Sequence, residues 1–510
     1  MTRQHTELLN FSQGLDLVSS LDTMPPGYTP QAMNYRIAQY GGIEKILGYS
    51  TLADLGVGVA AVDLFYFSKR DNTSRFLIAG SSTLWQSVDS AGVVATIRSG
   101  MTAESDHSFV TYEDTLYGLG SANTLFKWTG AGLATLVVGT NIPVSGVLLG
   151  VWQNQLYYSP TANPSRVIWS APGDFANFPA LNFVDLGGAG ESNKITAGQP
   201  VSDGLVVFCQ GSTFIIYDSS TGANNVVDPR FGTTSRRSVS ITEGIIYGAN
   251  RDGIFATNGR FPLKIISERV DPLFRTETPN LSSASGVVWF GSYLLSFGRN
   301  GNGTNNQTLD LFTRKDSAFD RFGSLMLNEY PSHGWAGGPL DGSHETLYFI
   351  DASQPRYIRK AFTGGAFTTG LATANNIQCY YETPPLNLGT EDLKRLNSLR
   401  LIGHGGQLQV GVKPDYSSNM ILITAVGFPL SGSAVWDAAT WDVSLWGGYV
   451  LSQAFPYTAC RARRFTLRFQ ESSQLVYPGR DVAGSGLSGV LGGTALYQIE
   501  PEFSVSSRRI

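Results

Sequence analysis

The chain has little charge for its length, and this limits what it can bind. Asp, Glu, Lys and Arg together make up 15 % of the 510 residues, whereas an average soluble protein has about 25 %. Lys and Arg number 36 against 40 Asp and Glu, a net charge of −4. The sequence therefore excludes a protein that holds nucleic acid by neutralising phosphates over its whole surface. Any nucleic-acid contact must be local or weak.

Cysteine and histidine are also scarce. The three cysteines, Cys209, Cys379 and Cys460, are far apart and form no C-x-x-C pair. They are typical of small buried residues in a reducing compartment and do not indicate a disulfide framework or a zinc site. The five histidines show no metal-ligand spacing such as H-E-x-x-H. We expect no metal and no other cofactor.

Long apolar runs are absent. No stretch approaches the roughly 20 apolar residues that a membrane-spanning helix needs, and the opening MTRQHTELLNFSQGLDLV has no apolar core of signal-peptide length. We therefore expect no membrane span and a chain that is made, and at first kept, in a cytoplasm.

Helical periodicity is nearly absent, with short candidates only at 268–274 and 391–397. Gly (58), Tyr (22) and Phe (28) are abundant instead. Apolar and polar residues alternate in segments such as EDTLYGL, and turns such as Asn258-Gly259 suit tight hairpins because Asn and Gly tolerate positive φ. The sequence predicts an all-β protein.

One pattern recurs along the first three quarters of the chain: an aromatic-rich run, a polar turn and a second apolar run. We take one residue of each copy as the marker of an equivalent inner strand: Tyr66, Tyr117, Tyr157, Phe208, Tyr247, Leu294 and Tyr348. The steps between markers are about 40 to 54 residues, which is the period of propeller blades. The pattern predicts a β-propeller of about six or seven irregular blades.

The pattern changes after residue 376. We predict a propeller over residues 1–376, including an N-terminal hairpin, and an antiparallel sandwich-like β domain over 377–510. The hairpin is NYRIAQYGGIEKILGYS, residues 34–50, in which Gly41-Gly42 separates two alternating runs. We expect it to supply the first strands of the propeller, with closure of the ring against the last blade as one option.

No catalytic motif is present: there is neither a G-x-S-x-G elbow nor a phosphate-binding G-x-x-x-x-G-K-[ST] loop. Acids that could flank a sugar bond are Glu113-Asp114, Asp310 with Asp316 and Asp320, and Glu391-Asp392. All sit in turn-like segments, so we interpret them as solvated loop residues and predict that the chain is not an enzyme.

Two basic clusters are the candidate contact residues: Arg236 with Arg237, and Arg461 with Arg463 and Arg464. In CRARRFTLRFQ, strict alternation would place charge on both faces of one strand. One interpretation is an edge strand protected by charge against stray pairing. The others are contact with DNA phosphate in a channel, or with an acidic patch on a neighbouring subunit.

The tryptophans at 436, 441 and 446 recur every five residues, which matches neither a helix face nor a strand face. We interpret them as anchors of an irregular hairpin, folded on its own domain or docked on a partner.

Several stretches resemble one family. FSQGLDLVSS followed by PPGYTPQAMNYRIAQYGGIEKILGYSTL resembles the N-terminal pattern of tailed-bacteriophage tail proteins. WQNQLYYSPTANPSRVIWSAPGDFANF, SDGLVVFCQGSTFIIY and FGTTSRRSVSITEGIIYGANRDGIFATNGR then follow in the order found in the nozzle or hub proteins of short-tailed phages. The resemblance covers residues 8–410.

The resemblance implies a non-enzymatic virion protein of the tail, assembled in the host cytoplasm as a ring, usually hexameric. It would contact other tail or portal and adaptor proteins and let double-stranded DNA pass without sequence specificity. Two other classes remain open: a glycan-binding or glycan-cleaving propeller, such as a tail enzyme or secreted lectin, and an intracellular scaffold propeller that binds proteins.

Overall fold

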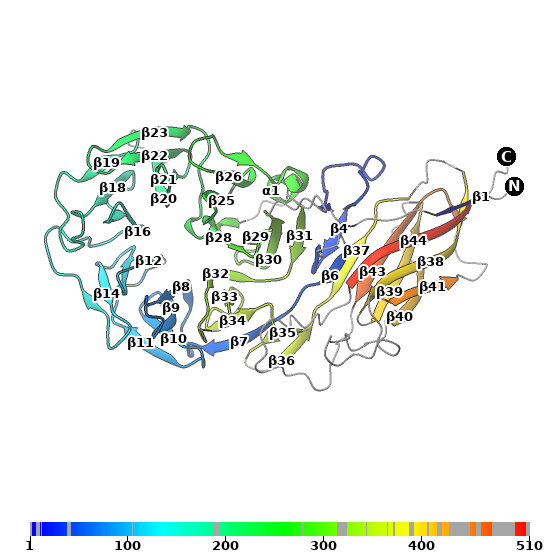
Figure 1. Ribbon diagram of the computed structural model, residues 1–510, viewed down its shortest axis with the longest axis horizontal. Helices are drawn as coiled ribbons and strands as arrows, with labels where there is room; N and C mark the ends of the chain where they lie inside the picture. Colours follow the sequence, from blue (N-terminus) through cyan, green and yellow to red (C-terminus); the bar gives the residue numbers. More distant parts are fainter. Residues whose placement is uncertain are drawn as a thin grey trace.

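The computed structural model describes residues 3–6, 11, 13–37, 42–104, 106–187, 193–276, 280–313, 324–342, 344–364, 366–370, 373–386, 392–404, 407–415, 421–427, 449–454, 461–471 and 495–505. Strands dominate this part of the chain (Figure 1). Its helical segments are short: η2 (Arg236–Ser238), η3 (Glu268–Val270) and α1 (Asp271–Arg275). The helical candidate at 268–274 is confirmed, whereas the one at 391–397 is wrong because residues 394–404 form a strand.

Seven successive sheets lie around a ring between residues 49 and 361 (Figure 1). The first three sheets consist of β8 (Ala61–Ser68), β9 (Arg75–Ser81), β10 (Trp85–Val88) and β11 (Val94–Arg98); β12 (His107–Tyr112), β13 (Thr115–Gly120), β14 (Phe126–Trp128) and β15 (Thr135–Leu136); and β16 (Leu148–Trp152), β17 (Gln155–Ser159), β18 (Arg166–Trp169) and β19 (Phe183–Asp185). The fourth and fifth consist of β20 (Ile195–Val201), β21 (Gly204–Cys209), β22 (Thr213–Asp218) and β23 (Ala223–Asp228); and β24 (Ser240–Thr242), β25 (Ile245–Asn250), β26 (Gly253–Thr257) and β27 (Lys264–Ile265).

The sixth and seventh sheets also take up strands from near the N-terminus. The sixth consists of β28 (Asn280–Trp289), β29 (Ser292–Gly298), β30 (Gln307–Phe312) and β31 (Leu325–Asn328), extended by β2 (Gly14–Leu15) and β3 (Tyr28–Thr29). The seventh consists of β32 (Ser332–Gly337), β33 (Leu347–Asp351), β34 (Tyr357–Ala361) and β7 (Tyr49–Asp54), followed by β35 (Ala366–Thr369) and β36 (Thr373–Asn376).

The sheets contact one another through their first strands. β8 contacts β12, β12 contacts β16, β16 contacts β20, η2 lies between β20 and β28, and β28 contacts β32, which in turn contacts β8. The first strands face the middle of the ring and the last strands its outside (Figure 1). The predicted all-β propeller is confirmed.

The repeat markers fall on different strands from those expected. Six of the seven, from Tyr117 to Tyr348, lie on the second strand of their sheet, and Tyr66 lies on the first strand, β8. The second strand is paired on both edges and packed on both faces, as in β21, where every residue is buried. Such a strand has the most regular apolar sequence, so it dominates the repeat pattern.

The last quarter of the chain, together with four strands from near the N-terminus, builds a further pair of sheets. One has the order β41 (Tyr449–Ala454), β38 (Lys394–His404), β44 (Ala495–Val505), β6 (Ile43–Lys45) and β5 (Tyr35–Ile37), with β1 (Arg3–Thr6) on β44 and β42 (Arg461–Ala462) on β38. The other has the order β4 (Gln31–Met33), β37 (Cys379–Glu382), β43 (Phe465–Glu471), β39 (Gln407–Pro414) and β40 (Ile421–Gly427). Both sheets contribute to one hydrophobic core that continues into the sixth and seventh propeller sheets.

The opening hairpin differs from its expected place. β5 and β6 pair with each other, but β6 then pairs with β44, so the hairpin belongs to the C-terminal pair of sheets. Of residues 34–50, only Tyr49 and Ser50, which begin β7, enter the propeller, where β7 pairs with β34 in the seventh sheet. Alternation specifies a hairpin and its buried face, but not which distant strand covers its edge.

Candidate functional site

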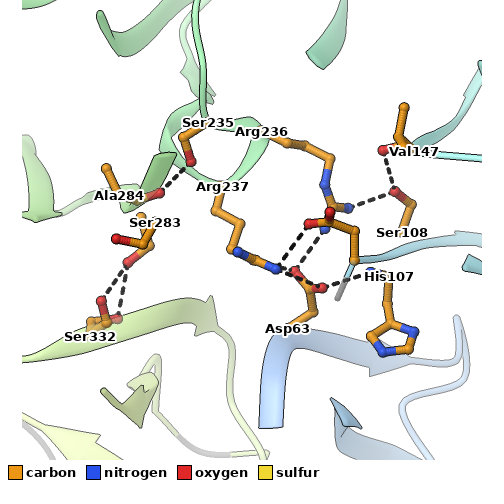
Figure 2. A network of polar contacts seen from close by, with 12 residues as sticks. Asp63, His107, Ser108, Val147, Ser235, Arg236, Arg237, Ser283, Ala284 and Ser332 are labelled. Carbon is orange, nitrogen blue, oxygen red and sulfur yellow. Dashed lines mark hydrogen bonds and ion pairs between the residues drawn. The ribbon is translucent and has the colours of Figure 1, made fainter. Parts of the chain in front are cut away.

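The first basic cluster lies on η2, the short turn between the fourth and fifth sheets. Side chains on either side hold this turn: Ser235 donates a hydrogen bond to the Ala284 carbonyl oxygen at 2.5 Å, and Thr233 donates one to the Ala249 carbonyl oxygen at 2.7 Å. With the backbone fixed in this way, Arg236 and Arg237 extend from η2 toward Asp63 (Figure 2).

Asp63, on β8, accepts hydrogen bonds from both arginines. Arg236 Nη2 and Arg237 Nε each lie 2.8 Å from its Oδ1, and the backbone N–H of His107 lies 2.7 Å from its Oδ2. Asp63 is only 6 % exposed. Burial alone would raise the pKa of its carboxyl group, but the charges of Arg237 and Arg236 outweigh this effect and hold the pKa far below its ordinary value.

The same arginines reach two further segments. Arg236 Nη1 donates to Ser108 Oγ at 2.6 Å, and Ser108 Oγ donates to the Val147 carbonyl oxygen at 3.2 Å. Arg237 Nη2 lies 3.1 Å from Asp106 Oδ1. These residues lie on or just before the first strands β8, β12 and β16 (Figure 2). We call Asp63, Asp106, Ser108, Arg236 and Arg237 the axial network, because it joins the inner strands across the middle of the ring.

The axial network explains what these arginines can do chemically. Their guanidinium groups donate to carboxylates of the same chain, so their charge is compensated internally. His333 lies nearby on β32, where burial and the charge of Arg237 lower its pKa and favour the neutral ring. The arrangement is a polar cluster in which both guanidinium groups have carboxylate partners.

The second basic cluster lies on β42 and in the connection between β42 and β43, strands of the two C-terminal sheets. Arg461 is on β42, opposite Arg395 of β38. Arg463 is exposed, and its backbone N–H donates to Asp415 Oδ1 at 2.7 Å. Arg464 forms an ion pair with Asp22. The structure therefore does not bring the two clusters together.

The predicted single strand through CRARRFTLRFQ is wrong, and its part from Phe465 onward is not an edge. The chain leaves one sheet after Ala462 and enters the other at Phe465. β43 then lies between β37 and β39, in the interior of its sheet. Its apolar residues alternate toward the core, and Arg468 on its other face pairs with Glu382 at 3.0 Å.

The candidate acids have different outcomes. Glu113 and Asp114 form the tip of the hairpin between β12 and β13, both with positive φ, as predicted. Asp310 was predicted in a turn, but it lies within β30. Asp316, Asp320 and Glu391 lie outside the described residues, as do Cys460 and the three tryptophans at 436, 441 and 446.

Within the described part of the chain, no cluster of His, Cys, Asp and Glu could hold a metal ion.

A cavity of about 490 Å³ is the feature that the sequence did not reveal. It lies where the sixth sheet, the seventh sheet and the β5–β6 hairpin meet. Its aromatic lining residues are Trp289, Phe290, Phe312 and Phe362. Its charged lining residues are Arg36, Glu44, Asp310, Glu345 and Lys360. The one local sequence feature that could have indicated the cavity is Phe290-Gly291 at a hairpin tip, where Asn-Gly is the usual pair.

Comparisons with known proteins give a fold-level likeness only. No protein-family model matches the chain, and neither does any curated protein. Similar solved structures include the computationally designed Ika8 protein, at 12 % identity and a TM-score of 0.37 over 61 % of this chain and 99 % of that one. The WD40 β-propeller domain of Doa1 matches at 10 % identity and a TM-score of 0.41, over 62 % of this chain and 96 % of that one.

A third similar structure is the extracellular domain of a proposed one-component system from B. thetaiotaomicron. It matches at 10 % identity and a TM-score of 0.44, over 85 % of this chain and 63 % of that one. None of these likenesses carries a functional argument.

Among the described residues, no helix has the length and apolar character needed to cross a membrane.

Proposed function

We propose that the chain is a non-enzymatic structural subunit of a short-tailed bacteriophage tail, where copies of it form a ring, the nozzle or hub, that extends or closes the DNA channel. The ring would serve genome retention and ejection. The observation that carries this proposal, beside the family resemblance, is the low charge of the chain, which has 15 % Asp, Glu, Lys and Arg and a net charge of −4. A channel through which DNA slides must not hold the phosphates, and such a chain offers few cations to bind them.

The axial network also supports a lumen between subunits. Arginine side chains from η2 bridge to β8 and β12, so the middle of each propeller is crossed by side chains of the same chain. A DNA duplex, whose major groove alone is about 12 Å wide, needs a wider passage than a propeller whose middle is crossed by side chains. In a closed ring of copies, six in our proposal, the passage lies on the symmetry axis of the assembly.

The outer edges of the second and third sheets offer a surface for neighbouring copies. Exposed large apolar residues lie in and around β15 and shortly before β19: Leu133, Leu136, Val138, Val144 and Leu181. Val138 and Leu181 are 85 % and 87 % exposed. We propose that these residues contribute to contacts between copies, because exposed apolar patches are typical of protein–protein contacts. Above and below the ring, the proposed partners are other tail proteins and the portal or adaptor.

The proposal is tested on particles released from the cell that carries this gene. Mass spectrometry of purified particles should find the chain among the tail proteins, and cryo-electron microscopy should show it as a closed ring with DNA or an open lumen on the axis. Particles that lack the chain would refute the virion assignment. A monomeric chain attached singly to the tail would refute the ring.

A further inference from the structure

The aromatic cavity has the size and composition of a ligand site. At about 490 Å³ it falls within the roughly 300–1,000 Å³ of small-molecule pockets, which combine apolar walls with a few polar groups. Three separate parts of the chain build it: the β28–β31 sheet, strands β33 and β34, and the β5–β6 hairpin.

Two of its aromatic residues have a backbone conformation that aromatic residues seldom adopt. Among the described residues, twelve residues other than glycine have positive φ. Ten of them are Asn, Asp, Glu or Gln, and the other two are Phe290, at 43°, and Phe362, at 56°. A bulky side chain in this region is unfavourable. Both exceptions line the same cavity, and conformational strain that gathers in one place is typical of functional sites.

Phe290 can be compared with its equivalents in other sheets. The first turn residue between the first and second strands is Glu113, Gln153 or Glu243 in the second, third and fifth sheets, each with positive φ. The turn therefore forms with polar residues, and folding does not require an aromatic one. Burial does not explain Phe290 either, because it is 77 % exposed.

Trp289 forms the adjoining wall and is held by its surroundings. Its ring lies 4.8 Å from that of Phe290, at 70° to it. On its other side it packs against Gly337 of β32, where any Cβ atom would overlap the indole ring. Phe362 packs against the buried Tyr330, with 5.4 Å between the ring centroids. Trp289 and Phe362 are thus preorganised.

The polar lining residues offer both hydrogen-bond acceptors and donors. Asp310 on β30 lines the cavity, and burial raises the pKa of its carboxyl group above the ordinary value. Arg36 is paired with Glu44 at 2.5 Å. Lys360 lines the cavity as a donor and Glu345 as an acceptor. A ligand hydroxyl group, which both donates and accepts, can be served by either kind of group.

We propose that this cavity binds one pyranose residue of a neutral glycan, with its C–H face against Trp289 or Phe290 and its hydroxyl groups bonded to Asp310 and Lys360. The electron-rich face of an aromatic ring attracts weakly positive C–H groups. The Asp310 carboxyl group interacts with Ser292 and Arg36, and a purely apolar ligand would leave its remaining acceptor capacity without a hydrogen bond. An anion would meet three acids, Glu44, Asp310 and Glu345, against the two basic groups Arg36 and Lys360. The site does not depend on the proposed role in a tail ring.

The experiment uses the full chain and a panel of free sugars: glucose, galactose, mannose, N-acetylglucosamine and rhamnose, with their disaccharides. Saturation-transfer NMR identifies the ligands, and calorimetry measures Kd. Phe290→Asn should weaken binding at least about tenfold while leaving the melting temperature equal or higher, because Asn-Gly suits this turn. Asp310→Asn should weaken binding by a similar factor. The matched control is Glu243→Asn, at the equivalent turn of the fifth sheet, and it should bind normally.

Three outcomes would overturn the proposal. In the first, no sugar of the panel binds. In the second, a sugar binds with a Kd that neither Phe290→Asn nor Asp310→Asn changes. In the third, the chain self-associates with a concentration dependence that Phe290→Asn abolishes, which would make the aromatic rim an interface between copies. None of these results bears on the presence of the chain in phage particles.

Discussion

Lys45 and Glu471 form a buried ion pair across 426 positions of sequence, with 3.0 Å between Nζ and Oε1. Their side chains are 2 % and 0 % exposed. Lys45 ends β6 in one of the C-terminal sheets, and Glu471 ends β43 in the other. The pair therefore connects the two sheets and fixes the opening hairpin to the end of the chain.

Replacing Lys45 by Met should strongly destabilise this domain. The change leaves the Glu471 carboxylate buried without its cation, which costs about 3–5 kcal/mol. Urea unfolding followed by tryptophan fluorescence measures the loss. Lys127→Met, at an exposed position of β14, is the control and should change stability by less than about 0.5 kcal/mol. Recovery in the double variant Lys45→Met/Glu471→Leu is expected, and its absence would show that the loss does not come from an unpaired charge.

Replacing Asp63 by Asn should destabilise the propeller by a similar amount, about 3–5 kcal/mol, because two largely buried guanidinium groups lose their shared carboxylate. Asp106→Asn removes the more exposed partner of Arg237 and should cost no more than about 1 kcal/mol. The two unfolding midpoints are compared at pH 7. Equal effects would contradict the central role of Asp63 in the axial network.

The contribution of Asp63 to the free energy of unfolding should decrease as the pH falls. Its pKa is lower in the folded state than the ordinary 3.8, so the folded state favours the ionised form. The stabilisation is fully present above about pH 4 and is lost as the pH falls from there toward the folded-state pKa. The difference in unfolding free energy between the native chain and Asp63→Asn should therefore shrink between pH 5 and pH 3. A difference that grows over this range would contradict the ion pairing.

Gly48 should not tolerate a side chain. It lies between β6 and β7, where the chain passes from the C-terminal sheets to the propeller, and a Cβ atom there would overlap the backbone carbonyl of Ala366. We expect Gly48→Ala to lower the unfolding free energy by about 1–3 kcal/mol. Gly303→Ala, where a Cβ atom meets nothing within 4 Å, is the control. Thermal unfolding distinguishes them, and equal melting temperatures would contradict the close packing at this crossing.

Binding of the isolated chain to duplex DNA should be weak, with a Kd of about 10⁻⁴–10⁻⁶ M that rises steeply with salt. Among the five candidate arginines, Arg463 is exposed, so Arg463→Ala should reduce the salt slope by about 1. Fluorescence anisotropy with a labelled duplex measures both quantities. Arg237→Ala should leave DNA affinity unchanged while lowering stability. A folded Arg237→Ala variant with weaker DNA binding would show that the axial network opens to phosphate.

The sequence by itself determined the local structure. Alternation and turn residues predicted many of the strands and hairpins, including the tip at Glu113-Asp114, because a hairpin is encoded within about ten neighbouring residues. They missed the break between β42 and β43 and placed Asp310 of β30 in a turn. The propeller repeat was visible for the same reason, although the most regular strand in each repeat is the second one of its sheet and not the innermost.

The tertiary structure alone decided which distant segments meet. Residues 43–45 pair with β44 near the end of the chain, the arginines of η2 meet Asp63 from the first sheet, and Asp310 lines a cavity built from three parts of the chain. No local pattern specifies these contacts. A strand edge or a buried charged side chain needs a partner, but the sequence around it does not specify which one. The closure of the ring and the packing of the two further sheets determine which partner is within reach.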